Sequence, residues 1–160
     1  MKRNLLLVLI CSIMLIGLLS MRMQNALRMS IPKSSVSLVP PANFILSDFY
    51  DGFLHKATNS SIIAKKEPGQ AYSYFNQRFT AQYLQNIGLT LIKQEEIKTK
   101  EMEGTLYLIS YVVKETNMHR YMLVTGDSKD TYIVMANYPV GYKSKISEPI
   151  KRSLMTVQYK

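Results

Sequence analysis

Residues 104–138 read GTLYLISYVVKETNMHRYMLVTGDSKDTYIVMANY, and this stretch decides the fold. It contains three runs rich in β-branched and aromatic residues, Gly104–Glu115, His119–Gly126 and Thr131–Tyr138. Short polar turns separate the runs, so the strands form hairpins and run antiparallel. Within Thr105–Val113 apolar residues occupy both odd and even positions, which predicts a central strand covered on both faces.

Strands are also expected on both sides of this stretch, where short apolar runs are bounded by proline, glycine and polar turn residues. They are Val36–Val39, Phe44–Leu46, Gly52–His55, Ser61–Lys65 and Leu89–Ile97 before it, and Thr156–Tyr159 at the C-terminus. Their close spacing predicts an antiparallel sheet.

Two helices are expected to pack on this sheet. The first covers Gln70–Asn86, because aromatic residues recur there along one helix face, and Gly88 ends it as a left-handed cap. The aromatic residues are Tyr72, Phe75, Phe79 and Tyr83. The second helix begins near Ser147, has Pro149 in its first turn and runs to Met155. The predicted fold class is therefore α+β, an antiparallel β-sheet packed with helices.

Composition limits the class of protein. The chain has 160 residues, 47% of them hydrophobic, a formal net charge of +9 and a single cysteine. That apolar content excludes intrinsic disorder, and one cysteine excludes an intramolecular disulfide framework. We expect an N-terminal signal-anchor or signal peptide at 1–21, a tether at 22–35 and one folded domain at 36–160.

The N-terminus indicates the compartment. Lys2 and Arg3 precede Leu5–Met21, an uncharged apolar run whose length lies between those of a secretory signal and a spanning helix. No pair of small residues marks a cleavage site, so we expect an uncleaved membrane anchor, with a cleaved signal as the alternative. The positive residues keep the N-terminus cytoplasmic. The domain is then periplasmic or extracellular, and it is secreted if the segment is cleaved.

No set of residues in the sequence forms a catalytic or metal site. His55 and His119 are the only histidines, and a metal site normally needs three or four ligands. Cys11 lies inside the apolar run, and no nucleophile elbow is present. Asp127 and Asp130 are interpreted as turn residues. We therefore expect no enzyme activity, no metal and no cofactor.

Two groups of residues are candidates for binding. The basic cluster consists of Lys143, Lys145, Lys151 and Arg152. It favours an anionic lipid surface or an acidic protein partner, and its size and the exported location argue against nucleic acid. The tyrosine group consists of Tyr107, Tyr111, Tyr121 and Tyr132, expected on neighbouring strands. Packing against the helices is the favoured interpretation of a common tyrosine face, and a recognition surface is the alternative.

The order of these elements resembles the PsbP-like domains. The resemblance covers about residues 38–158 and rests on short apolar motifs in sequence order. The motifs are Asn43–Leu46, Gly52-Phe53, Ser61–Ile63, the following helix, Met122–Gly126, Thr131–Met135, Tyr138-Pro139 and Ile150–Leu154. It implies an α/β/α sandwich like those of the photosystem extrinsic protein, a Ran-binding nuclear import factor and DcrB-like bacterial envelope proteins.

The resemblance implies a non-catalytic accessory or interaction module on the outer side of a membrane. It supplies no catalytic motif, and this chain lacks the lipobox of the lipoprotein members. Two other functions stay open. A small-ligand carrier requires a cavity between the sheet and Gln70–Asn86, and a secreted hydrolase requires buried, pKa-perturbed acids or histidines in one cleft.

Overall fold

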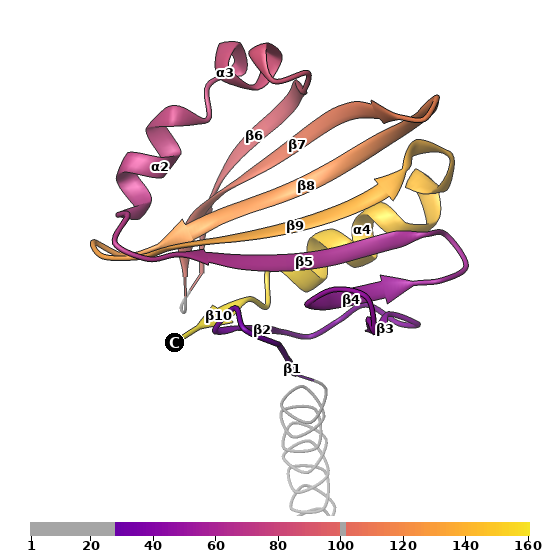
Figure 1. The fold of residues 1–160 in the computed structure, drawn as a ribbon, viewed down its shortest axis with the longest axis horizontal. Coiled ribbons are helices and arrows are strands. Elements are labelled where there is room, and N and C mark those ends of the chain that lie inside the picture. The colour runs from indigo at the N-terminus through magenta and orange to yellow at the C-terminus, as the bar shows by residue number, and fades with distance from the viewer. Residues whose placement is uncertain (1–27, 100–101) are drawn as a thin grey trace, which may run out of the picture.

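The computed structural model describes residues 28–99 and 102–160 (Figure 1). The expected anchor Leu5–Met21 and Cys11 lie outside the described residues. Within the described part, no helix combines the length and the apolar character needed to cross a membrane.

A seven-stranded antiparallel sheet with the strand order β3-β4-β5-β9-β8-β7-β6 forms the centre of the molecule. Its strands are β3 (Ile45–Leu46), β4 (Gly52–His55), β5 (Ser60–Glu67), β6 (Thr90–Lys98), β7 (Glu103–Val113), β8 (Thr116–Gly126) and β9 (Thr131–Pro139). Four consecutive strands, β6 to β9, form a meander, and β9 then pairs with the earlier strand β5. The antiparallel α+β prediction is confirmed.

The strand β7 only partly fulfils its predicted role. Leu106 is buried on one face of the sheet and Tyr107 on the other, as the two-faced pattern predicts. However, β7 lies next to the edge strand β6, and Val112 and Val113 near its end are 63% and 47% exposed. The prediction of a fully covered central strand is wrong for this end, because the β7–β8 hairpin extends past the elements that cover the sheet.

A second, three-stranded sheet joins the two ends of the described chain. It consists of β1 (Met29–Ile31), β2 (Val36–Leu38) and β10 (Gln158–Tyr159), in the order β1-β2-β10. Ile31 and Ser34 are buried, and Arg28 Nη1 donates to the carbonyl of Thr156 at 2.5 Å. The segment expected as a tether at 22–35 therefore contains a folded strand. Its sequence shows no strand pattern, and the strand forms because β1 pairs with β2.

The single helix expected at Gln70–Asn86 is two helices, α2 (Tyr72–Arg78) and α3 (Ala81–Asn86). Thr80 has an extended backbone, and its Oγ1 accepts from Tyr83 N at 3.1 Å. This N-cap begins a new helix and ends the previous one. The prediction of one continuous helix was wrong, because the spacing of the aromatic residues gives no sign that Thr80 caps a second helix.

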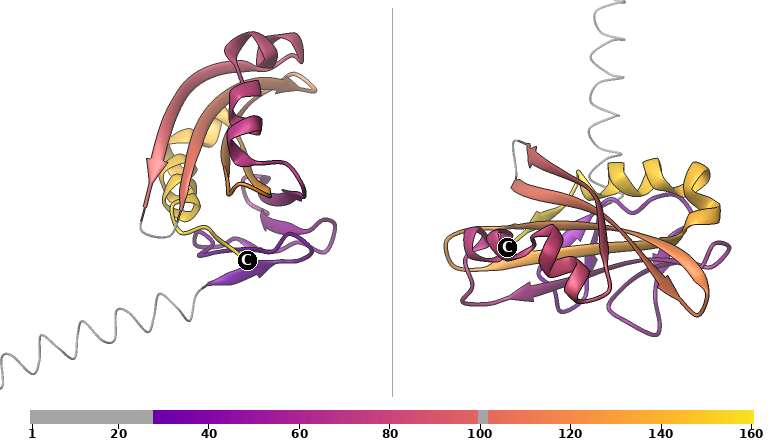
Figure 2. Two further views of the ribbon diagram at one scale, coloured as in Figure 1. Left: turned by 90° about the vertical axis from the view of Figure 1, so that its left-hand side faces the viewer. Right: turned by 90° about the horizontal axis from the view of Figure 1, so that it is seen from above.

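The helix α4 (Lys143–Leu154) follows the short 3₁₀ turn η1 (Val140–Tyr142) and begins earlier than expected. Pro149 lies inside α4 rather than in its first turn. A proline there has no N–H for the carbonyl of Lys145, so α4 loses one internal hydrogen bond at this point. Figure 2 shows α4 on one side of the large sheet and α2 on the other.

Each side of the large sheet has its own core. On one side α4 and the small sheet bury an apolar cluster that includes Phe53, Leu123 and Ile150. On the other side α2 and α3 cover a smaller cluster that includes Leu84 and Ile133. Helices thus cover both sides of the seven strands, and the small sheet lies on the side of α4.

Candidate functional site

A groove runs along α4, opposite the segment that connects β2 to β3. It consists of two adjoining hollows of about 290 and 530 Å³ that share Ala42 and Pro149. The first is also lined by Val39, Pro40, Pro41, Arg152, Ser153 and Thr156, and the second by Asn43, His55, Ala57, Thr58, Tyr142, Lys145 and Ile146. We call these residues together the α4 groove.

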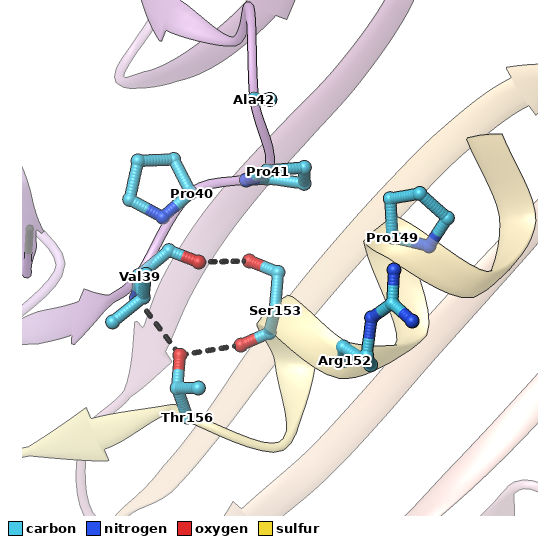
Figure 3. Close-up of a pocket in the computed structure, with 8 residues that line it drawn as sticks. All are labelled: Val39, Pro40, Pro41, Ala42, Pro149, Arg152, Ser153 and Thr156. Atoms are coloured by element: carbon cyan, nitrogen blue, oxygen red, sulfur yellow. Dashed lines mark hydrogen bonds between the residues drawn. The ribbon is translucent and has the colours of Figure 1, made fainter. Parts of the chain in front are cut away.

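Hydrogen bonds fix one end of the α4 groove, as Figure 3 shows. Ser153 Oγ donates to the carbonyl of Val39 at 2.6 Å, and Val39 N donates to Thr156 Oγ1 at 2.8 Å. Thr156 Oγ1 in turn donates to the carbonyl of Ser153 at 2.7 Å. Both hydroxyl groups are therefore used to hold the wall at Val39 against α4.

The floor and walls of this end are mainly apolar. Pro40, Pro41 and Pro149 lack backbone N–H groups, and their rings lie on either side of the opening in Figure 3. The hydroxyl groups of Ser153 and Thr156 are already bonded, and among the described residues the guanidinium of Arg152 has no hydrogen-bond or ion-pair partner.

Two cations of the predicted basic cluster belong to the α4 groove. Lys145 and Arg152 stand seven residues apart in α4, a spacing that places them on the same helix face as Pro149. Neither has a hydrogen-bond or ion-pair partner among residues 28–99 and 102–160, and the lining contains no acidic residue. The groove therefore combines an apolar surface with two positive charges that form no ion pair with the described residues.

No protein-family model matches this sequence, and no curated protein matches it either. Solved structures do. LpqN of Mycobacterium tuberculosis, described as involved in cell envelope biogenesis, is similar with a TM-score of 0.56 and 13% identity over 79% of this chain and 84% of LpqN. Cyanobacterial PsbP (CyanoP) of Synechocystis is similar with a TM-score of 0.56 and 14% identity over 83% of this chain and 91% of that protein.

The chain has a PsbP-like fold. A third protein, from Bacteroides thetaiotaomicron, is similar with a TM-score of 0.50 and 16% identity over 82% of this chain and 47% of that one. The resemblance in element order is thereby confirmed for the fold. The α4 groove lies between the last helix of this PsbP-like fold on one side, and the β2–β3 segment with the end of β4 and the β4–β5 turn on the other.

The other two residues of the basic cluster lie outside the α4 groove. Lys151 Nζ binds both carboxylate oxygens of Glu95 on β6, each at 3.1 Å. Lys93 and Lys151 together lower the pKa of Glu95. Lys143 is exposed at the start of α4. The structure therefore divides the cluster into a structural lysine, an exposed lysine and two groove cations.

The four tyrosines do not share a face of the PsbP-like sheet. Tyr107 and Tyr111 point to the side of α2 and α3, whereas Tyr121 and Tyr132 point to the side of α4. Tyr107, Tyr121 and Tyr132 are buried, which fits packing and removes them from any exposed patch. Burial raises the pKa of Tyr107 to about 12, and its hydroxyl donates to Asn76.

Apolar side chains fill the interface at which the alternative hypothesis of a small-ligand carrier requires a cavity. Phe75, Phe79 and Leu89 pack there on the buried cluster that includes Leu84 and Met122. This packing counts against a ligand cavity between the sheet and the two helices.

His119 lines a separate hollow of about 480 Å³ beside the β7–β8 hairpin. Burial and then the positive charge of Lys143 lower its pKa. Its Nδ1 lies 3.5 Å from the hydroxyl of Tyr138, whose own pKa burial raises to about 12. A phenol of that pKa stays protonated, and no carboxylate pairs with His119 within the part of the chain that the structure describes.

The two aspartates after β8 are turn residues, as the sequence predicts. Asp127 Oδ1 accepts from the backbone N–H groups of Lys129 and Asp130 at 2.7 and 2.9 Å. Asp130 pairs with Lys66 at 2.7 Å and accepts from Gly69 N at 3.0 Å. These bonds lower the pKa of both aspartates. Across residues 28–99 and 102–160, no three potential ligands gather to hold a metal ion.

Proposed function

We propose that this protein is a non-catalytic accessory module of the cell envelope, which holds an acidic, partly apolar segment of a partner protein in the α4 groove. One observation carries the proposal. Lys145 and Arg152 face the same apolar groove and have no acidic partner in the described chain. A partner that supplies carboxylates beside apolar side chains satisfies both surfaces at once.

The likeness to LpqN and cyanobacterial PsbP supports an envelope setting for the proposal. The former is described as involved in cell envelope biogenesis, and the fold is common to all three chains. The apolar run Leu5–Met21 with its preceding positive residues supports export and tethering to a membrane. The domain then faces the periplasm or the cell exterior.

An exposed aromatic side chain in the loop between β3 and β4 supports the orientation of this loop toward the membrane. Phe49 is 86% exposed in the loop between β3 and β4, and Ile45 and Leu46 beside it are also exposed. Asp51 in the same loop lies 3.4 Å from Lys33 in the β1–β2 turn, so the loop lies beside the small sheet. An aromatic side chain at that position suits the lipid–water interface.

Affinity recovery from solubilised membranes tests the proposal. The bait is the full chain, compared with the double variant Lys145→Gln/Arg152→Gln and with Lys143→Gln as a matched control on the same helix. We expect proteins recovered with the wild type to be recovered with Lys143→Gln and lost with the double variant. Equal recovery with all three baits rejects the α4 groove as the binding site, and recovery of anionic lipid instead of protein rejects the protein partner.

A further inference from the structure

A polar cluster crosses four neighbouring strands on the sheet face opposite the α4 groove. Its members are Tyr111 on β7, Arg120 on β8, Asn137 on β9 and Ser61 on β5. Arg120 is directly opposite Asn137, and Asn137 is directly opposite Ser61. The helices α2 and α3 pack farther along the same strands, over Met122, Val124 and Ile133, and the cluster itself stays half-exposed.

The cluster holds the guanidinium of Arg120 in one orientation. Arg120 Nε donates to Asn137 Oδ1 at 2.7 Å, and its Cζ lies 4.9 Å from the centre of the Tyr111 ring. The Tyr111 hydroxyl donates to the same Oδ1 at 2.8 Å. Asn137 Nδ2 donates to Ser61 Oγ at 3.2 Å, which fixes the orientation of the amide.

The two terminal nitrogens of Arg120 remain available. They have no hydrogen-bond or ion-pair partner in residues 28–99 and 102–160. A guanidinium that is stacked on a ring and bonded through Nε presents a planar pair of donors, which matches the two oxygens of a carboxylate. Because the side chain is already ordered, binding costs less conformational entropy than at a free surface arginine.

Apolar side chains flank this donor pair. Met118 lies two residues before Arg120 on β8, and Met135 lies two residues before Asn137 on β9, so both project from the same face. Both are partly exposed, and methionine adapts to apolar groups of different shape. We propose that the Arg120 cluster is a binding site for a carboxylate attached to a compact apolar group, independent of the α4 groove.

Titration with benzoate tests the site, with benzamide as its neutral counterpart. The full chain in lipid nanodiscs is labelled with ¹⁵N-arginine, and the Nε–H resonance of each arginine is followed by NMR. We expect benzoate to shift the Arg120 resonance in a saturable manner and benzamide to leave it unchanged. Arg78 on α2 is the internal control, because its guanidinium also lies over a tyrosine ring. Its Cζ is 5.5 Å from the centre of the Tyr74 ring. Equal shifts at Arg78, or equal shifts with benzamide, overturn the proposal.

Variants test whether Arg120 itself binds the carboxylate. Arg120→Lys keeps the charge and loses the planar donor pair, so we expect its affinity for benzoate, measured by isothermal titration calorimetry, to fall by about tenfold or more. Arg78→Lys keeps the wild-type affinity for benzoate. Unchanged affinity in Arg120→Lys, with the far-ultraviolet circular dichroism of the wild type, rejects the site. N-acetyl-leucine imitates the C-terminus of a polypeptide and so distinguishes the source of the carboxylate. Tighter binding than that of benzoate indicates a polypeptide C-terminus, and equal or weaker binding indicates a small carboxylic acid.

Discussion

Replacement of Ser153 by alanine measures how strongly the wall of the α4 groove is held to the helix. Ser153 is 4% exposed, and its Oγ donates to the carbonyl of Val39 at 2.6 Å, across 114 residues of sequence. The substitution removes the donor and leaves that carbonyl without it. A buried acceptor left unpaired costs about 1–3 kcal/mol. Val39 is half-buried, so water restores part of the bond, and we expect the free energy of unfolding to fall by about 1–2 kcal/mol.

Urea unfolding of the full chain in mild detergent, followed by circular dichroism, provides the measurement. Ser144→Ala is the matched control, because Ser144 is exposed on the same helix and the same atoms are removed. We expect the control to change the free energy of unfolding by less than about 0.5 kcal/mol. An equal effect of the two substitutions refutes the reasoning that the Ser153 hydroxyl clamps the groove wall.

Three further outcomes are expected. The lowered pKa of His119 means that the folded state favours the neutral imidazole, so its share of stability is present above the ordinary value of 6.5 and is lost as the pH falls below it. We expect His119→Gln to weaken the dependence of the free energy of unfolding on pH between pH 7.5 and 5. The same dependence in the variant and the wild type contradicts the lowered pKa of His119. Ile150→Ala, at a fully buried position of α4, lowers the free energy of unfolding by about 2–5 kcal/mol, whereas Val112→Ala at an exposed position changes it by less than about 0.5 kcal/mol in the same assay. Phe49→Ser weakens sedimentation of the chain with anionic vesicles, and undiminished sedimentation rejects the loop as a membrane contact.

The antiparallel meander could be predicted from the sequence because its signals are local. Apolar runs separated by polar turns specify hairpins without knowledge of the rest of the chain. The strand at Met29–Ile31 could not be predicted, because its partner is β2, which in turn pairs with β10 at the other end of the chain. Continuity of the first helix was predicted wrongly because Thr80 caps a second helix inside an unbroken aromatic pattern.

Half of the candidate site could be found from sequence. Charge alone selected Lys145 and Arg152, and also Lys151, whose pairing with Glu95 depends on the distant strand β6. The opposite wall of the α4 groove comes from the segment after β2, so its proximity follows only from the fold. The sheet face to which each tyrosine points could not be predicted for the same reason. Alternation shows which residues of one strand share a face, but only the register between strands shows which residues of neighbouring strands do.

Photocrosslinking from inside the groove tests the central claim most directly. A photoreactive phenylalanine derivative replaces Ala42, which lines both hollows of the α4 groove, or Gln82, which is exposed on α3. In cells that produce the chain, we expect a discrete crosslinked protein from position 42 that disappears in the Lys145→Gln/Arg152→Gln background, and none from position 82. The same products from both positions, or products from position 42 that persist in the double variant, contradict the assignment of the α4 groove as the partner-binding surface.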